Sequence, residues 1–118
     1  MHEFSIAEPL LKAALETAKA QGGLPIEQVC VQIGRLRRVM PEALDCAFAA
    51  LAKGTLAEGA TFVWKEIPPR VCCRACYTNF QPEDDWFWTC PNCGAEDGEL
   101  LEGNDVVLQR VIFHDATR

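Results

Sequence analysis

The amino-acid sequence predicts an α+β fold, in which a small sheet has two helices on one face and a four-cysteine zinc-ribbon domain is inserted. Segments with the apolar periodicity of helices and segments with the composition of strands predict the first part. A cysteine-rich stretch with two C-x-x-C pairs predicts the second. The chain of 118 residues is long enough for one core with a small appendage, but not for a large catalytic barrel.

Two amphipathic helices are expected. The first is predicted over residues 5–21, where Ser5 can cap the free backbone N–H groups and Glu8 completes an S-x-x-E capping box. The second is predicted over residues 41–53, because Pro41 suits a first helical turn and a glycine ends the apolar pattern.

Three strands are expected over residues 26–33, 61–67 and 106–113, where β-branched and aromatic residues are frequent. Packing both helices on one face of the resulting sheet leaves neither helix with an uncovered apolar side.

The composition changes sharply near residues 68–70, from apolar segments to cysteines, turn formers and acidic residues. The sequence therefore predicts an α+β domain made of residues 1–69 and 104–118, with the zinc-binding domain inserted at residues 70–103.

Composition also excludes several classes of protein. Eleven basic and seventeen acidic residues give a formal charge of −6, which disfavours binding to nucleic acid. No apolar run approaches the length of a membrane span, and the first residues lack a signal-peptide pattern. An odd number of cysteines, seven, favours metal over disulfides. We expect a cytoplasmic protein with no membrane insertion.

The strongest motif consists of two C-x-x-C pairs, Cys73 with Cys76 and Cys90 with Cys93. Two tight turns at this spacing can present four thiolates to one tetrahedral ion. Since all four positions are filled, we expect structural rather than catalytic Zn(II). A zinc-ribbon adaptor for protein interactions and a thiol oxidoreductase are the alternative functions that the same cysteines leave open.

The remaining cysteines are not expected to bind metal. Cys72 could substitute for its neighbour Cys73 but is interpreted as a spare, partly exposed thiol. Cys30 in a strand and Cys46 in a helix are interpreted as small interior hydrophobes.

Two groups of side chains leave two interpretations open. The aromatic group between the cysteine pairs is Trp86, Phe87 and Trp88. It either packs the zinc ribbon, which we favour, or forms an exposed patch for a partner. The basic group is Arg35, Arg37 and Arg38. It is either a solvated loop or a surface that docks an acidic partner.

The amino terminus can chelate a metal ion. The α-amine of Met1, the backbone nitrogen of His2 and the His2 imidazole can close adjacent chelate rings on one ion, and Glu3 can add a carboxylate. This nitrogen-rich, tetragonal donor set suits Ni(II) or Cu(II) better than Zn(II). The other histidine, His114, has no partner motif and is interpreted as a surface residue.

These features together resemble the HypA/HybF family of hydrogenase-maturation nickel metallochaperones. The resemblance covers essentially the whole chain and ends in the double C-x-x-C. The segments that carry it are Met1-His2-Glu3-Phe4-Ser5-Ile6-Ala7, Ile33-Gly34, Pro41-Glu42-Ala43-Leu44, Ala52-Lys53-Gly54-Thr55 and Glu58-Gly59-Ala60. Tyr77 departs from the family, which frequently has glycine after the first cysteine pair.

The resemblance implies a metal carrier without enzymatic activity. His2 corresponds to the family's nickel ligand, with Glu3 in the same motif, and the four paired cysteines correspond to its structural zinc ligands. The family delivers Ni(II) to the large-subunit precursor of [NiFe]-hydrogenase together with a nickel-binding GTPase. In some bacteria it also serves urease maturation.

Overall fold

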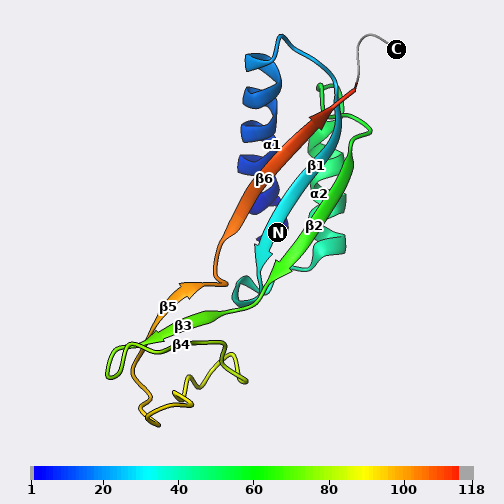
Figure 1. Cartoon of the computed structure of the whole chain (residues 1–118). Helices are drawn as coiled ribbons and strands as arrows, with labels where there is room; N and C mark the ends of the chain where they lie inside the picture. Colours follow the sequence, from blue (N-terminus) through cyan, green and yellow to red (C-terminus); the bar gives the residue numbers. More distant parts are fainter. Residues whose placement is uncertain (1, 115–118) are drawn as a thin grey trace. The chain divides into compact units, whose positions relative to one another are not determined.

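A computed structural model describes residues 2–114, with His2 described by its backbone alone (Figure 1). The helices are α1 (His2–Ala20), the short 3-10 helix η1 (Arg35–Arg37) and α2 (Pro41–Ala52). The strands are β1 (Ile26–Gly34), β2 (Thr61–Ile67), β3 (Arg70–Cys73), β4 (Asn79–Phe80), β5 (Gly98–Glu102) and β6 (Val106–Phe113). No helix in this part of the chain is long and apolar enough to span a bilayer.

The prediction of an α+β fold is confirmed, but η1 and the three strands β3, β4 and β5 were not predicted, and the start of one predicted helix differs. Helix α1 begins at His2, so Ser5 lies inside it and the predicted capping box is wrong. The first turn carries Glu3, whose carboxylate interacts favourably with the positive end of the helix dipole. A charged side chain in that turn allows the helix to extend upstream of the hydroxyl that seemed to be its cap.

The chain divides into two compact units. Unit 1 contains the residues up to Gln32, Val39–Lys65 and the residues from Val106 onward. Unit 2 contains Ile33–Arg38 and Glu66–Asp105. Unit 2 therefore includes a short basic segment that is distant in the sequence from the cysteines.

Unit 1 is built on a sheet with the strand order β2-β1-β6. In Figure 1 the arrows of β1 and β2 run in the same direction, and that of β6 runs in the opposite direction. The parallel pair needs a crossover connection, which α2 supplies. Both helices lie on the same face of this sheet (Figure 1).

Small side chains let the helices of unit 1 pack closely. Ala7, Ala14 and Ala18 of α1 are fully buried, as is Leu44 of α2. The ring of Phe48 on α2 lies 5.6 Å from that of Phe62 on β2, which joins the second helix to the sheet. The buried side chains thus form one continuous apolar layer between helices and sheet.

The two cysteines of unit 1 behave differently. Cys30 of β1 is buried, which confirms its interpretation as an interior residue. Cys46 is exposed, so the same interpretation is wrong there. Helix α2 turns Leu44, Ala47 and Phe48 inward, and Cys46 falls on the opposite side because successive helical residues are rotated by about 100°.

Unit 2 is built on a second sheet, with the strand order β4-β3-β5. Strand β3 pairs antiparallel with both neighbours, which places Val71 opposite Phe80 on β4 and opposite Leu100 on β5. Val71 and Phe80 are buried together with Cys73 and Cys90. Two of the predicted metal ligands are therefore also core residues of this unit.

Candidate metal centres

The four paired cysteines converge in unit 2. The sulfur atoms of Cys73, Cys76, Cys90 and Cys93 all lie within 4.8 Å of one another. The Sγ atoms of Cys73 and Cys93 are 3.6 Å apart, and those of Cys76 and Cys90 are also 3.6 Å apart. Tetrahedral coordination with Zn–S bonds of about 2.3 Å requires sulfur atoms about 3.8 Å apart. The four sulfur donors and their spacing therefore fit one tetrahedral metal ion whose four coordination positions are all filled by the protein.

Backbone hydrogen bonds shape each cysteine pair into the same kind of turn. The N–H of Tyr77 donates to the carbonyl of Cys73 at 2.8 Å, and the N–H of Gly94 donates to the carbonyl of Cys90 at 2.9 Å. Tyr77 and Gly94 both adopt positive φ, 63° and 78° respectively. Each turn closes directly after its second cysteine, which aims both thiols of the pair in one direction.

Hydrogen bonds around the cluster favour ionisation at Cys76. The Thr78 hydroxyl lies 3.1 Å from the Cys76 sulfur, and the Asn92 amide donates to that sulfur at 3.5 Å. These groups, with Thr78 contributing most, lower the pKa of Cys76 to about 6 because they stabilise the thiolate. Roles for Thr78 and Asn92 were not predicted from the sequence, although Asn92 lies within the second C-x-x-C pair and Thr78 lies two residues after the first.

At Cys93 the neighbouring thiols shift the pKa in the opposite direction. The Ala95 backbone N–H lowers the pKa of Cys93, but the neighbouring thiols outweigh it and raise the pKa to about 12. Negative charge on one sulfur thus disfavours negative charge on the next. A divalent ion removes this conflict because it stabilises all four thiolates together.

The N-terminal candidate site is described only in part. Met1 and the side chain of His2 lie outside the described residues. Glu3 is in the first turn of α1, and its Oε2 lies 3.4 Å from the backbone N–H of Met40. Met40 is the N-cap of α2, so the Glu3 carboxylate joins the starts of the two helices.

The structure also describes the surroundings of the other residues that the sequence singled out. Cys72 is partly exposed, as expected for a spare thiol. His114 is exposed, with Nδ1 3.9 Å from a carboxylate oxygen of Glu27. Arg35 and Arg38 are not a free basic surface, because both contact the carboxylate of Asp85, at 3.2 and 3.1 Å.

Of the three aromatic residues between the cysteine pairs, one packs into unit 2 and two are exposed. Trp88 packs against the buried cluster of unit 2, as favoured from the sequence. Trp86 and Phe87 are exposed, so packing of the ribbon is the wrong interpretation for these two.

Comparison with solved structures shows the same fold elsewhere. The solution structure of the Ni metallochaperone HypA from Helicobacter pylori matches with a TM-score of 0.73 at 24% sequence identity, over 96% of this chain and 97% of that one. A second solution structure, of a HypA protein, matches with a TM-score of 0.76 at 23% identity.

Comparison with protein sequences shows the relationship directly. The chain is 32% identical to a hydrogenase maturation factor HypA from Acidithiobacillus ferrooxidans, over 94% of this chain and 97% of that protein. It is 36% identical to one from Picosynechococcus, over 92% and 96% of the two chains. Residues 1–113 match the family model described as "Hydrogenase/urease nickel incorporation, metallochaperone, hypA". The chain therefore belongs to the HypA family of nickel-incorporation metallochaperones.

Proposed function

We propose that the chain binds Ni(II) through the Met1 α-amine, the His2 backbone nitrogen and the His2 imidazole, with Glu3 beside them. The family role in nickel incorporation supports a nickel site, and the nitrogen-rich start of the chain is the donor set in this sequence that suits Ni(II). A metallochaperone carries an ion rather than converting a substrate, in agreement with the expectation that the chain is not an enzyme.

The position of His2 in α1 supports this chelate. His2 is the first residue of the helix, and the first four N–H groups of an α-helix have no intrahelical acceptor. Ni(II) can therefore replace the proton on the His2 backbone nitrogen, with the proton released to water, without breaking a helical hydrogen bond. Binding at this position leaves the rest of α1 intact.

Glu3 supports the site from the next position. Its carboxylate approaches the N–H of Met40, which fixes the first turn of α1 against the start of α2. We infer that Glu3 holds the nickel-binding end of the helix in place and supplies negative charge next to the cation.

A site at the end of a chain suits delivery. In this proposal an incoming ligand replaces the nitrogen donors one at a time. We infer that the acceptor is the large-subunit precursor of [NiFe]-hydrogenase in the cytoplasm, and that a nickel-binding GTPase of hydrogenase maturation takes part. Urease maturation factors are further candidate partners, since the family description includes urease.

The cysteine cluster is proposed to hold structural Zn(II). All four tetrahedral positions would be filled by sulfur, which leaves none for a substrate or water. In this account residues 70–103 form the zinc domain, and the nickel domain consists of residues 1–69 and 104–118. The bound ion would stabilise the fold of the cysteine-rich segment rather than move to the acceptor.

Replacing His2 tests whether nickel and zinc bind at separate sites. For His2→Ala, we expect nickel affinity to fall more than about a hundredfold, because loss of even an outer-shell group of a metal site costs about 10–100-fold. The zinc content should stay unchanged. Equilibrium dialysis of untagged protein followed by elemental analysis measures both.

His114→Ala is the matched control, since His114 is an exposed histidine that is distant in the sequence from the amino terminus. It should bind nickel as the unmodified chain does. Equal nickel affinity in His2→Ala and His114→Ala would contradict the proposed site.

A further inference from the structure

Two large aromatic side chains of unit 2 are exposed to solvent. Trp86 is 76% exposed and Phe87 is 67% exposed, although both lie between the two cysteine pairs. Neighbouring exposed aromatic rings on a small domain are characteristic of binding surfaces, because each ring gains hydrophobic free energy when a partner covers it.

The loop that carries these rings is held by specific contacts. The carboxylate of Asp84 accepts a hydrogen bond from the backbone N–H of Trp86 at 2.7 Å. The indole N–H of Trp88 donates to the carbonyl of Asp85 at 3.1 Å, while its ring packs on the buried cluster. These contacts fix the loop on both sides of Phe87. A fixed loop loses little conformational entropy when a partner binds.

The basic segment of unit 2 fixes the same loop from another direction. The Asp85 carboxylate contacts the guanidinium groups of both Arg35 and Arg38. The guanidinium of Arg38 also lies 4.9 Å from the centre of the Trp86 ring, within cation–π range. Trp86 is thus supported on one side while most of its surface stays exposed.

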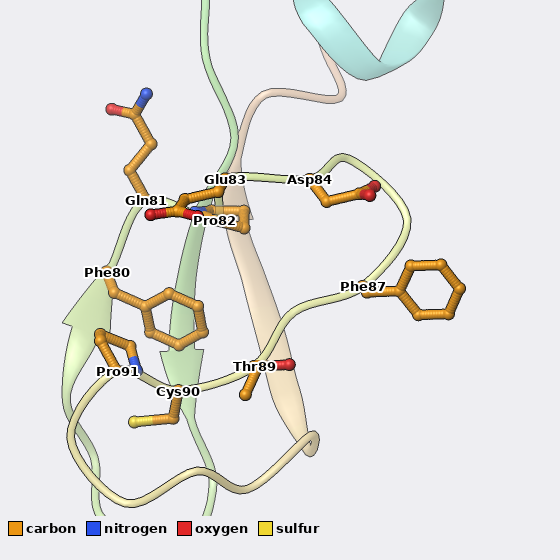
Figure 2. A pocket seen from close by; sticks show the side chains of 9 residues that line it. All are labelled: Phe80, Gln81, Pro82, Glu83, Asp84, Phe87, Thr89, Cys90 and Pro91. Carbon is orange, nitrogen blue, oxygen red and sulfur yellow. The ribbon is translucent and has the colours of Figure 1, made fainter.

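A hollow of about 420 Å³ is lined by one of the two exposed aromatic residues, Phe87, which directly follows Trp86 in the chain. Its walls include Phe80, Pro82, Phe87 and Pro91. In Figure 2 the ring of Phe80 points into the hollow, and Phe87 extends outward from its loop. The hollow is open to solvent and apolar on several sides, so it can accept one apolar side chain of another molecule.

The rim of this hollow is acidic. Glu83 and Asp84 line it, and among the described residues the Glu83 carboxylate makes no ion pair. Asp85 is already paired with two arginines. Unit 2 as a whole carries nine acidic and five basic residues. This charge repels nucleic acid and anionic lipid, and attracts a basic polypeptide.

We propose that Trp86, Phe87 and the adjoining hollow form a docking surface for a basic, apolar segment of a partner protein. One aliphatic side chain of that segment enters the hollow, and the exposed rings of Trp86 and Phe87 contact the neighbouring apolar residues of the segment. Its lysine or arginine side chains contact Glu83 and Asp84. The proposal concerns partner recognition by unit 2. It goes beyond the proposed nickel site and does not depend on it.

A labelled peptide tests the surface. The probe is a short fluorescein-labelled peptide in which arginines alternate with leucines, titrated with the full-length, zinc-loaded chain and followed by fluorescence anisotropy. We expect binding that weakens with added salt. We also expect the affinity to be about tenfold lower for Phe87→Ser, as for loss of an aromatic anchor. Glu83→Lys should weaken binding as well.

Matched variants and peptides make the test decisive. Tyr77→Asn removes another exposed aromatic residue that does not line the hollow, and asparagine tolerates positive φ, so this variant should bind as the unmodified chain does. Peptides with glutamate in place of arginine, or serine in place of leucine, should bind at least about tenfold more weakly.

Three results would overturn the proposal. The first is equal affinity for Phe87→Ser and Tyr77→Asn at equal zinc content. The second is equal affinity for the three peptides. The third is binding of the unmodified chain to anionic lipid vesicles in preference to the basic peptide, which would identify the exposed rings as a membrane contact.

Discussion

Tyr77 occupies a backbone conformation that disfavours a side chain. Its φ of 63° matches that of Gly94 in the second cysteine turn, at 78°. The left-handed conformation costs a residue with a Cβ about 1–2 kcal/mol, and a change to glycine removes this cost. Part of the resulting stabilisation is offset because glycine has a larger conformational entropy in the unfolded chain. Tyr77→Gly should therefore stabilise metal-loaded unit 2 by about 1 kcal/mol.

Denaturant unfolding of the metal-loaded protein measures this gain. It is followed by the fluorescence of Trp86 and Trp88 in a Trp64→Phe background, because Trp64 belongs to unit 1. Tyr77→Ala is the control, because it removes the same ring but keeps the Cβ. If alanine stabilised the unit as much as glycine, ring exposure rather than backbone strain would be the cause.

Thr78 tunes the acid stability of the metal site. A thiol whose pKa in the folded protein is depressed keeps its charge until the pH falls through that pKa, which is about 6 for Cys76. Thr78→Val removes the largest contribution to that shift, so the pKa of Cys76 rises and protons displace the metal at higher pH. We expect the midpoint of metal release to move upward in pH.

A chromophoric chelator monitors this release during acid titration. Thr89→Val is the matched control, because Thr89 directly precedes Cys90 and, among the described residues, its hydroxyl makes no hydrogen bond to the four sulfur atoms. This variant should leave the midpoint unchanged. A midpoint for Thr78→Val that stays with the control would contradict the assigned role of the hydroxyl.

Three chain segments of unit 2 meet with little space between their backbones: residues 34–36, 68–69 and 103–105. The N–H of Gly34 donates to the carbonyl of Asp105 at 2.7 Å, and the N–H of Leu36 donates to that of Gly103 at 2.9 Å. A Cβ on Gly34 would lie 2.4 Å from the Gly103 carbonyl carbon, and one on Gly103 would lie 2.5 Å from the Cα of Pro69. Both glycines are therefore needed for close approach.

Gly34→Ala tests this crossing. The φ of Gly34 is −65°, which alanine adopts without backbone strain, so the destabilising contribution is steric. The lower chain entropy of alanine in the unfolded state offsets part of it. We expect a loss of about 2–3 kcal/mol, typical of overpacking against backbone. Gly22→Ala is the control: its φ is 90° but no atom lies within 4 Å of the added Cβ, so it should cost about 1–2 kcal/mol. Chemical denaturation compares them, and a smaller loss for Gly34→Ala than for Gly22→Ala would contradict the crossing.

The elements differ in how well the sequence predicts them. Strand β2 has its predicted bounds because β-branched and aromatic residues fill it and two prolines follow it. The strands β3, β4 and β5 were not predicted, since segments of two to five residues show no readable periodicity and pair only when distant segments meet. The predicted start of α1 was wrong because Glu3 stabilises a first helical turn upstream of Ser5, which the capping pattern did not reveal.

At the scale of the whole molecule, the cysteine cluster should control the folding of one unit only. Two of its sulfurs belong to the small core of unit 2, and structural zinc supplies on the order of 10 kcal/mol of folding free energy. Cys90→Ser should release the metal and disorder residues 70–103, while α1 and α2 keep their structure.

Amide hydrogen exchange read by mass spectrometry resolves the two units. Cys46→Ser is the control, because Cys46 is an exposed thiol on α2. It should retain the metal and native protection throughout. Unchanged protection across residues 70–103 in metal-free Cys90→Ser would show that the unit folds without its ion.

Spacing in the sequence predicted which four cysteines meet, because two C-x-x-C turns have few ways to present their thiols to one ion. It did not predict the contacts of Asp85 with Arg35, fifty positions away, and with Arg38. Such contacts depend on the tertiary fold, which brings Arg38 beside the exposed ring of Trp86. The nickel donors at the amino terminus stay a prediction.

Nickel titration before and after capping of the α-amine tests the central claim most directly. The untagged, zinc-loaded chain is titrated with Ni(II) and followed by absorption spectroscopy, then the titration is repeated on protein whose amino terminus is acetylated. The account predicts absorption bands of tetragonal, nitrogen-bound Ni(II) for the free terminus and their loss after acetylation, with zinc retained in both. Identical nickel spectra and affinity in the two samples, or no nickel binding to the free terminus, would contradict it.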